Sequence, residues 1–229
     1  MTCTRLFVPF ALLALFVVGT GCASTPTNGD SEKGFTPLFN GKDLTGWEYG
    51  TGAGAKAGNG YQIAEGGVLY CTKTDGGNLY TAKDYDNFVI RFDFKLEPDG
   101  NNGIGVHAPT TGNVSYDGIE IQILDDEGPK HKGIIKPWQH HGSVYGCVAA
   151  KPGSLKPVGE WNTEEIVVNG RKIKVTLNGN VIVDADLDRD VTDPEVIAKH
   201  PGLKRTTGRI ALLGHGTRVE FRNLRAKEL

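Results

Sequence analysis

The stretch Phe88-Val-Ile-Arg-Phe-Asp-Phe-Lys-Leu96 decides the fold class. Every second residue in it is apolar, namely Phe88, Ile90, Phe92, Phe94 and Leu96. The positions between them hold Val89 and the charged residues Arg91, Asp93 and Lys95. Successive side chains of a strand point to opposite faces of its sheet. A period of two over this stretch therefore predicts a half-buried antiparallel strand.

Turn signals later in the chain predict further strands. Asn169-Gly170 and Asn178-Gly179 lie between alternating runs at residues 165–168, 172–177 and 181–186. Asn-Gly supplies the positive φ angles of a type I′ turn, so these runs predict a three-stranded meander. Residues 209–213 and 218–224 predict a final strand pair. The sequence Asp193-Pro194-Glu195 predicts a helix of one or two turns, because a capping residue precedes a proline.

Composition favours an all-β protein in one domain. Glycine accounts for 32 of 229 residues, about twice its ordinary share, and no collagen period accompanies it. Many short strands without βαβ alternation predict a β-sandwich. No linker is visible within residues 35–229, so we expect a single domain there. The formal net charge is −2 without a basic patch, which argues against nucleic acid as a partner.

The N-terminal residues 1–21 are typical of an export signal. Arg5 precedes an apolar run, Leu6–Val18, that is shorter than the ~20 residues of a membrane-spanning helix. Small residues before Cys22 resemble a bacterial lipobox, so we expect a lipid on Cys22, followed by a flexible tether that ends at residue 34. The expected location is the bacterial cell envelope, anchored to a membrane through that lipid in the periplasm or at the outer surface. Plain secretion is the alternative.

Two cysteines, Cys71 and Cys147, lie in the expected domain. An exported protein folds in an oxidising compartment, where the two can pair. Two separate buried thiols are the other interpretation, because spacing alone does not place the Cα atoms within reach of each other.

The most informative stretch for chemistry is Tyr116-Asp-Gly-Ile-Glu-Ile-Gln-Ile-Leu-Asp125. Its isoleucines point into the core, which places Glu120 and Gln122 side by side on the opposite face. Asp125 joins them only if a β-bulge re-aims it. The spacing then resembles the carboxylate strand of laminarinase-type glycosidases, which hold two carboxyl groups about 5–5.5 Å apart. The plain alternative is the solvated face of an amphipathic strand.

Histidines and one long loop supply further candidates. His107 ends the strand that begins at Gly103, and His140-His141 lies in a loop that also carries Trp138. Aromatic and charged side chains on one loop are suited to a sugar-binding rim. No zinc motif, nucleophile elbow or phosphate-binding loop is present in the sequence. We therefore expect no cofactor; a calcium site lacks the spacing of a known calcium loop.

Several motifs resemble one known family. They include Leu38-Phe-Asn-Gly-Lys-Asp-Leu-Thr-Gly-Trp47, Asn102-Gly103, the stretch Asp117–Asp125, Gly142-Ser-Val-Tyr-Gly146, Gly159-Glu-Trp-Asn162 and His215-Gly216. Together they resemble the DUF1080 family, the 3-keto-disaccharide hydrolase domain, over residues 35–229. The resemblance implies a concanavalin A-like jelly roll and activity on 3-keto-glycosides. The chain differs at His107, where the family often has arginine.

The chemistry implied by this resemblance needs a base, donors for an enolate oxygen and an acid. For base and acid we select four candidates: Glu120, Asp125, His141 and His215. For substrate binding we select Gln122, Asn102, His107, Trp138 and Tyr145. A carbohydrate-binding module without catalysis and a laminarinase-type endo-glycanase are the alternatives, because concanavalin-like sandwiches carry several functions.

Overall fold

The structure is a computed structural model that describes residues 1–2, 32–50, 60–72 and 77–229. Residues 3–21 of the predicted signal, the expected lipid-attachment site Cys22 and most of the tether lie outside the described residues. Residues 34–229 form one compact unit. Across the described part of the chain, no helix has the length and apolar character that crossing a membrane requires.

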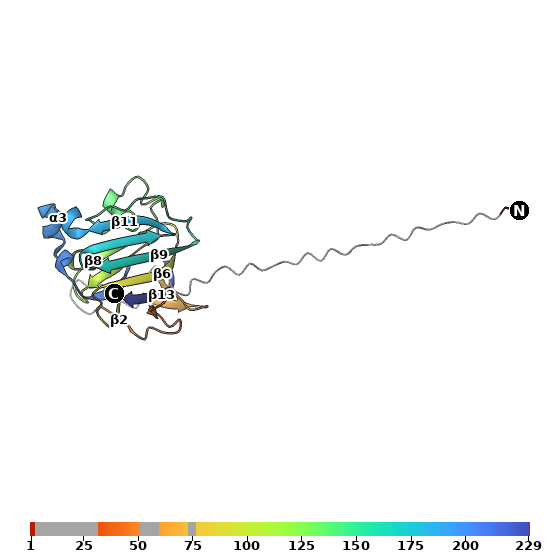
Figure 1. The fold of residues 1–229 in the computed structure, drawn as a ribbon, viewed down its shortest axis with the longest axis horizontal. Helices are drawn as coiled ribbons and strands as arrows, with labels where there is room; N and C mark the ends of the chain where they lie inside the picture. Colours follow the sequence, from red (N-terminus) through yellow and green to blue (C-terminus); the bar gives the residue numbers. More distant parts are fainter. Residues whose placement is uncertain (3–31, 51–59, 73–76) are drawn as a thin grey trace. The chain divides into compact units, whose positions relative to one another are not determined.

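Two antiparallel sheets make up this unit (Figure 1). The larger sheet has the strand order β11-β10-β9-β6-β13-β4-β3, and β1 pairs with β13. Its strands are β1 (Thr36–Pro37), β3 (Tyr61–Ala64), β4 (Val68–Cys71), β6 (Phe88–Leu96), β9 (Trp161–Asn169), β10 (Lys172–Leu177), β11 (Asn180–Asp186) and β13 (Val219–Glu228). The smaller sheet has the order β2-β5-β12-β7-β8. Its strands are β2 (Trp47–Tyr49), β5 (Gly77–Thr81), β7 (Asn101–Ala108), β8 (Ile119–Leu124) and β12 (Arg209–Gly214). The predicted all-β jelly-roll sandwich is confirmed.

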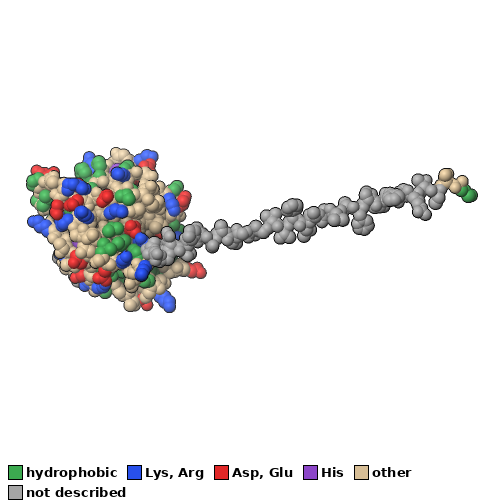
Figure 2. All heavy atoms as spheres, viewed as in Figure 1, with side chains coloured by type: hydrophobic (Ala, Val, Ile, Leu, Met, Phe, Trp, Pro, Cys, Tyr) green, Lys and Arg blue, Asp and Glu red, His purple; other side chains and the backbone are tan. Residues whose placement is uncertain are grey.

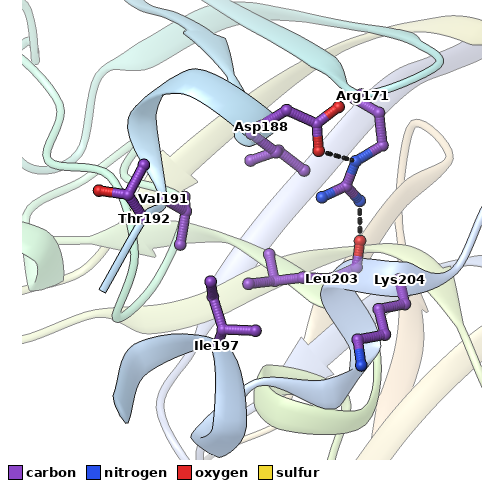
Figure 3. Close-up of a pocket in the computed structure, with 8 residues that line it drawn as sticks. Arg171, Asp188, Val191, Thr192, Ile197, Leu203 and Lys204 are labelled. Atoms are coloured by element: carbon purple, nitrogen blue, oxygen red, sulfur yellow. Dashed lines mark hydrogen bonds and ion pairs between the residues drawn. The ribbon is translucent and has the colours of Figure 1, made fainter. Parts of the chain in front are cut away.

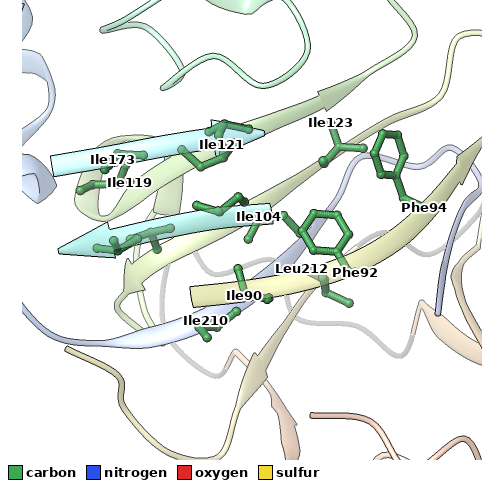
Figure 4. Packing of buried hydrophobic residues seen from close by; sticks show 14 of the residues in the cluster. Ile90, Phe92, Phe94, Ile104, Ile119, Ile121, Ile123, Ile173, Ile210 and Leu212 are labelled. Atoms are coloured by element: carbon green, nitrogen blue, oxygen red, sulfur yellow. The ribbon is translucent and has the colours of Figure 1, made fainter. Parts of the chain in front are cut away.

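The core lies between the two sheets, and Figure 4 shows its centre. The alternation of β6 places Ile90, Phe92 and Phe94 in this core, all fully buried. The isoleucines of β8 come from the opposite sheet to meet them. Burying one such side chain contributes about 2 kcal/mol to folding. The alternation of apolar residues in β6 and in β8 therefore determines which face of each strand packs against the opposite sheet.

Turns and strand partners follow the sequence in part. The meander β9–β10–β11 forms as predicted. Asn178 and Gly179 both have positive φ, as a type I′ turn requires, but the first loop has positive φ only at Gly170, as in type II′. The predicted final strand pair is wrong, because β12 and β13 belong to different sheets. A short connection there crosses from one layer of the sandwich to the other.

The helices are short and lie at the edges of the sheets. Asp193 caps α3 (Pro194–Lys199), accepting a hydrogen bond from the Glu195 N–H at 2.8 Å, as the capping signal predicted. Two further short helices, α1 (Val114–Asp117) and α2 (Leu187–Asp190), were not predicted. Two 3₁₀ turns complete the unit, η1 (Pro137–Gln139) and η2 (Pro201–Lys204).

Basic and acidic side chains are interspersed over the face of the molecule shown in Figure 2.

The two cysteines of the unit are not paired with each other. Cys147 carries a free thiol, so it forms no disulfide with Cys71. Burial raises the pKa of the Cys147 thiol to about 11.

Candidate functional site

The outer face of β8 is buried, although the sequence allowed it to be a solvated face. Glu120 and Gln122 point away from the core, and they are 3% and 4% exposed. Burying a carboxylate and an amide costs free energy unless partners satisfy them. The site is therefore built around two polar groups that the fold holds away from bulk water.

Glycines on the neighbouring strand give Glu120 its room. Gly103 and Gly105 of β7 pair with Gln122 and Glu120 of β8. A Cβ atom at Gly103 would lie 2.3 Å from Glu120 Oε1, so the carboxylate rests directly on this bare backbone. Beyond β7, the carboxylate reaches His215, which directly follows β12; the distance from Glu120 Oε1 to His215 Nε2 is 3.8 Å.

A loop segment covers the free edge of β8. The Gln122 N–H donates to the Ser143 carbonyl at 3.0 Å, and the Gly142 N–H donates to the Gln122 carbonyl at 2.7 Å. The Tyr145 N–H donates to the Glu120 carbonyl at 2.9 Å. These bonds fix Tyr145 against the strand that carries the carboxylate. The loop before this segment supplies the remaining wall.

These elements enclose a cavity of about 250 Å³. Its described lining consists of a carboxylate, two histidines, several amides and hydroxyls, and two apolar side chains: Asn101, Asn113, Ser115, Tyr116, Glu120, Gln122, Leu124, His131, Ile135, Gln139, Tyr145 and His215. At about 30 Å³ per water molecule, this volume holds roughly eight waters, the size of one sugar ring. We call this space the inner cavity.

Two amide oxygens of the inner cavity have no hydrogen-bond partner among the described residues. They are Gln122 Oε1 and Asn101 Oδ1, and both are buried. An unsatisfied buried acceptor costs about 1–3 kcal/mol, so native proteins rarely keep one without a reason. Hydroxyl groups of a bound molecule are suitable donors for both oxygens.

His131 faces the inner cavity in a defined tautomer. Its Nδ1 lies 2.8 Å from the Asp125 carbonyl, and a carbonyl only accepts, so Nδ1 carries hydrogen. The neutral ring then presents Nε2 as an acceptor, the arrangement that suits a proton-transfer group. His131 was not among the residues predicted for the site. A histidine seven residues past a strand end gives no signal until the loop folds back over the strand.

Of the predicted site residues, Glu120, Gln122, Tyr145 and His215 line the inner cavity. Asn102 does not, contrary to expectation: it is fully buried on the core side, where its amide donates to the Tyr61 hydroxyl at 3.0 Å. Asn101 lines the cavity in its place. The sequence held this signal, because Asn102 alternates in phase with the core residues Ile104 and Val106.

His107 is another predicted residue that lies outside the inner cavity. Its two ring nitrogens face main-chain carbonyls, Nε2 at 2.7 Å from Asp86 and Nδ1 at 3.2 Å from Arg205. The ring is 2% exposed and packs edge-on against Phe88. The structure therefore places His107 in a link between three loops, away from the substrate position that we expected.

Asp125 and His141 also lie away from the inner cavity. No β-bulge re-aims Asp125, because the β7–β8 register is regular. Its carboxylate accepts from the Asp99 N–H at 2.9 Å instead. His141 turns into the core, where Nε2 lies 2.8 Å from Glu164 Oε2 and the ring stacks on Phe94 at 4.9 Å between centroids.

A larger hollow of about 620 Å³ lies elsewhere and has a different character (Figure 3). Arg171 at its rim is already bound to Asp188, at 3.0 Å, and to the Leu203 carbonyl. The remaining lining is mainly aliphatic and contains no histidine or glutamate. Size alone therefore does not identify the site; the smaller cavity holds the reactive groups.

No metal centre is evident in the part of the chain that the structure describes. Within it, no group of three or more histidine, cysteine, aspartate or glutamate side chains is placed to hold an ion. Glu120, His215, His131 and the amides around them can supply proton transfer and hydrogen bonding at the inner cavity.

Known proteins resemble this chain over most of its length. The 3-keto-disaccharide hydrolase of Bacteroides thetaiotaomicron is 26% identical over 231 residues, which cover 86% of this chain and 79% of that protein. A crystal structure from Parabacteroides distasonis, provisionally assigned as a glycosyl hydrolase, is 26% identical with a TM-score of 0.72; the match covers 90% of this chain and 98% of that one.

A more distant structure shows the fold alone. It is a Bacillus subtilis protein with a galectin-like fold, 12% identical with a TM-score of 0.53, covering 85% of this chain and 94% of that one. The family comparison extends over almost the whole compact unit, from residue 34 to residue 227. The chain belongs to the family of 3-keto-alpha-glucoside-1,2-lyase-like domains.

Proposed function

We propose that the inner cavity cleaves 3-keto-glycosides by elimination followed by hydration. Family membership and the hydrolase relative support an enzyme that acts on carbohydrates. One observation carries the finer proposal: a buried carboxylate beside an imidazole, Glu120 and His215, shares a sugar-sized cavity with two unsatisfied amide oxygens. This combination suits a polar ring that must lose a proton.

The reaction follows from the acidity that a ketone confers. A carbonyl at C3 acidifies the proton on C2, so a base can remove it and leave an enolate. The enolate re-forms the carbonyl and a C1=C2 double bond while the bond from C1 to the glycosidic oxygen breaks. The departing oxygen takes a proton from an acid. Water then adds hydroxide at C1 and a proton at C2, and the net result is hydrolysis.

The proton abstraction and the binding of the enolate oxygen have candidate groups in the inner cavity. Glu120 is our choice for the base, because it is buried and is the only carboxylate among the described residues that line the cavity. His215 next to it stabilises the anionic carboxylate when protonated and can relay the proton. The amide groups of Gln122 and Asn101 bind the sugar hydroxyls and the enolate oxygen.

The lining argues against direct displacement by two carboxylates. Retaining glycosidases need a nucleophile and an acid about 5–5.5 Å apart, and inverting enzymes need about 6.5–9.5 Å. Glu120 is the only carboxylate among the described lining residues. Elimination needs a single base, which this cavity supplies. The laminarinase-type alternative therefore loses its support.

Paired substrates test the proposed function. The purified protein is incubated with a glucoside and with the same glucoside oxidised at C3. We expect aglycone release only from the 3-keto compound, because the unoxidised sugar has no acidic C2 proton. Release from both compounds would indicate an ordinary glycosidase, and release from neither would favour the carbohydrate-binding module.

An exchange experiment tests the mechanism. A 3-keto sugar without a leaving group at C1 is incubated with the protein in D₂O. Deuterium at C2, detected by proton NMR, is the expected result, because the base removes this proton before the C1 bond breaks. Turnover of 3-keto-glycosides without any exchange at C2 would contradict the elimination route.

We also propose that the chain is exported and anchored by a lipid on Cys22. The apolar run Leu6–Val18 and the small residues ahead of Cys22 support this location. Labelling of bacteria with a palmitate analogue is expected to mark the wild-type protein, and Cys22→Ala is expected to abolish the label. Equal labelling of both would contradict the proposal.

A further inference from the structure

The proposed reaction needs a second proton-transfer group besides Glu120. The departing oxygen must gain a proton in the elimination, and the water that adds at C1 must lose one in the hydration. His215 lies 3.8 Å from Glu120 Oε1, so it acts together with the base. The other titratable side chains in the described lining are those of His131, Tyr116 and Tyr145. These three are therefore the candidates for the second group.

An imidazole is better suited to this task than the aromatic side chains nearby. A phenol has a pKa of about 10 and an imidazole of about 6.5. A group whose pKa lies near the working pH both gives and regains a proton readily. Trp138, which we predicted for substrate binding, lines a neighbouring hollow of about 320 Å³ instead of the inner cavity, and an indole N–H only donates. The chemistry therefore favours His131.

Hydrogen bonding determines which atom of His131 carries the mobile proton. Nδ1 lies 2.8 Å from the Asp125 carbonyl. Because this oxygen only accepts, Nδ1 keeps its hydrogen in both the neutral and the charged ring. Nε2 is then the atom that gains and loses a proton. The ring thus has a single reactive atom, which one group needs if it is to act as acid and as base in turn.

The segment that carries His131 is anchored to two neighbouring elements. The His131 N–H donates to the Gly128 carbonyl at 2.8 Å. The Lys130 N–H donates to Asp99 Oδ1 at 2.9 Å, and the Asp125 carboxylate accepts from the Asp99 N–H at 2.9 Å. Asp99 lies in the turn between β6 and β7, and Asp125 directly follows β8. The imidazole is therefore held in position before a substrate binds.

We propose that His131 is the acid of the elimination step and the base of the hydration step. This inference rests on the proposed function, which makes Glu120 the base at C2. In the elimination, Glu120 takes the proton from C2 and the C1=C2 double bond forms. The bond from C1 to the glycosidic oxygen breaks, and protonated His131 gives its Nε2 hydrogen to that oxygen.

The hydration reverses both proton transfers. Neutral His131 takes a proton from water, and the hydroxide oxygen bonds to C1 of the enone. The C1=C2 double bond is consumed as Glu120 returns its proton to C2. Both side chains then have the charge with which they began, so one cycle consumes one water and needs no other reactant.

Two leaving groups and one substitution test the assignment. His131→Gln is compared with wild type on methyl 3-keto-glucoside and on nitrophenyl 3-keto-glucoside. Methoxide needs a proton in order to leave, whereas nitrophenolate leaves without one. We expect kcat/KM for the methyl glycoside to fall about 10²–10⁴-fold, and kcat/KM for release of nitrophenol to stay within about a factor of three. The enone should accumulate in the variant, followed by its ultraviolet absorbance, because hydration has lost its base.

Two further variants decide between His131 and its neighbours. His140→Gln is the matched control, since His140 belongs to the same loop and does not line the inner cavity. It should leave the turnover of both glycosides unchanged. Tyr145→Phe removes a hydroxyl from the cavity wall. A difference between the two leaving groups in Tyr145→Phe, with none in His131→Gln, would assign the acid to the tyrosine and overturn the proposal.

Deuterium exchange separates this proposal from the proposed function. In D₂O, His131→Gln should exchange the C2 proton of a 3-keto sugar without a leaving group as fast as wild type, because Glu120 is intact. Equal losses of exchange and of turnover on both glycosides would mean that His131 only supports the cavity. That result, or full turnover of the methyl glycoside by His131→Gln, overturns the role of His131 and retains the enzyme. Wild-type protein without exchange or turnover would overturn the proposed function itself.

Discussion

Two pairs of glutamate and histidine lie on opposite sides of β8, and their surroundings differ. Glu164 and His141 are sealed between the sheets, 2.8 Å apart and stacked against Phe94. Glu120 and His215 are 3.8 Å apart and face the inner cavity. The same two residue types therefore serve packing in one place and have access to a bound molecule in the other.

Hydrogen bonding fixes the buried pair in one protonation pattern. The Leu124 N–H donates to His141 Nδ1 at 3.3 Å, so His141 Nε2 carries the hydrogen and donates it to Glu164. The other oxygen of Glu164 has no partner among the described residues. Neither residue of this pair lines the inner cavity. The comparison teaches that access, more than residue identity, marks the reactive pair.

The largest effect is expected at the open pair. Glu120→Gln removes the base while keeping the size of the side chain, so kcat for a 3-keto-glycoside should fall about 10²–10⁴-fold. Steady-state kinetics measures the loss. Glu165→Gln is the control, because Glu165 pairs with Arg91 on the other sheet and should leave kcat unchanged. Unchanged turnover in Glu120→Gln would contradict the assignment of the base.

A large loss of stability, without a chemical effect, is expected at the sealed pair. Glu164→Ala leaves His141 without its acceptor and opens a space in the core, which should lower the free energy of unfolding by about 3 kcal/mol. Denaturant unfolding followed by fluorescence measures it. Protein that remains folded should keep the kcat of wild type. A stable Glu164→Ala protein with greatly reduced kcat would reverse the roles of the two pairs.

An intermediate effect is expected at the glycine beneath the carboxylate. Gly103→Ala places a methyl group where Glu120 Oε1 now lies, so the side chain must move. We expect kcat/KM to fall about tenfold. A misplaced catalytic group often lowers the rate by more than this. Gly105→Ala is the comparison, because its methyl group would meet Ala211 and Val114 instead. It should reduce stability more than activity.

The smallest effect is expected at His200, which belongs to neither of the two glutamate–histidine pairs. Burial is the main cause that lowers the pKa of His200 below its ordinary value of 6.5, and the nearby Lys199 adds to it, while the bond to the Ser115 carbonyl opposes it. The folded state binds this proton more weakly than the unfolded state. The stabilising contribution is thus present above pH 6.5 and is lost as the pH falls toward the folded pKa.

Unfolding measured between pH 5 and pH 7.5 checks this direction. In wild type the free energy of unfolding should decline below about pH 6.5, and in His200→Gln the decline should be shallower. A steeper decline in the variant would mean that protonation of His200 stabilises the fold.

Alternation predicted the faces of the strands but not their neighbours. The pattern in Phe88–Leu96 and the isoleucines of β8 gave the core correctly. Glu120 and Gln122 were placed on the right face for the same reason. His215 lies beside Glu120 because β12 pairs with β7. No local sequence pattern encodes this pairing between distant segments. Asn102 was wrongly assigned to the site, although its alternation with Ile104 and Val106 indicated the core side.

The loop after β8 shows the other limit of sequence reasoning. Asp125 was expected at the site from its spacing to Glu120, provided that a β-bulge re-aimed it, and His141 was expected there as a histidine of the long loop that follows. Their direction was decided by the segment that pairs with the edge of β8 and by a regular register without a bulge. His131 and Tyr116 reach the inner cavity only because the loop and α1 fold over it.

The pairing of residues 142–145 with β8 has a consequence for solubility. β8 is the last strand of its sheet, and an open last strand is a template on which other chains can add. The segment that positions Tyr145 also occupies those main-chain groups. Shortening this loop, in a natural relative or an engineered one, should therefore produce self-association as well as a wider cavity, so the length of the loop is constrained twice over.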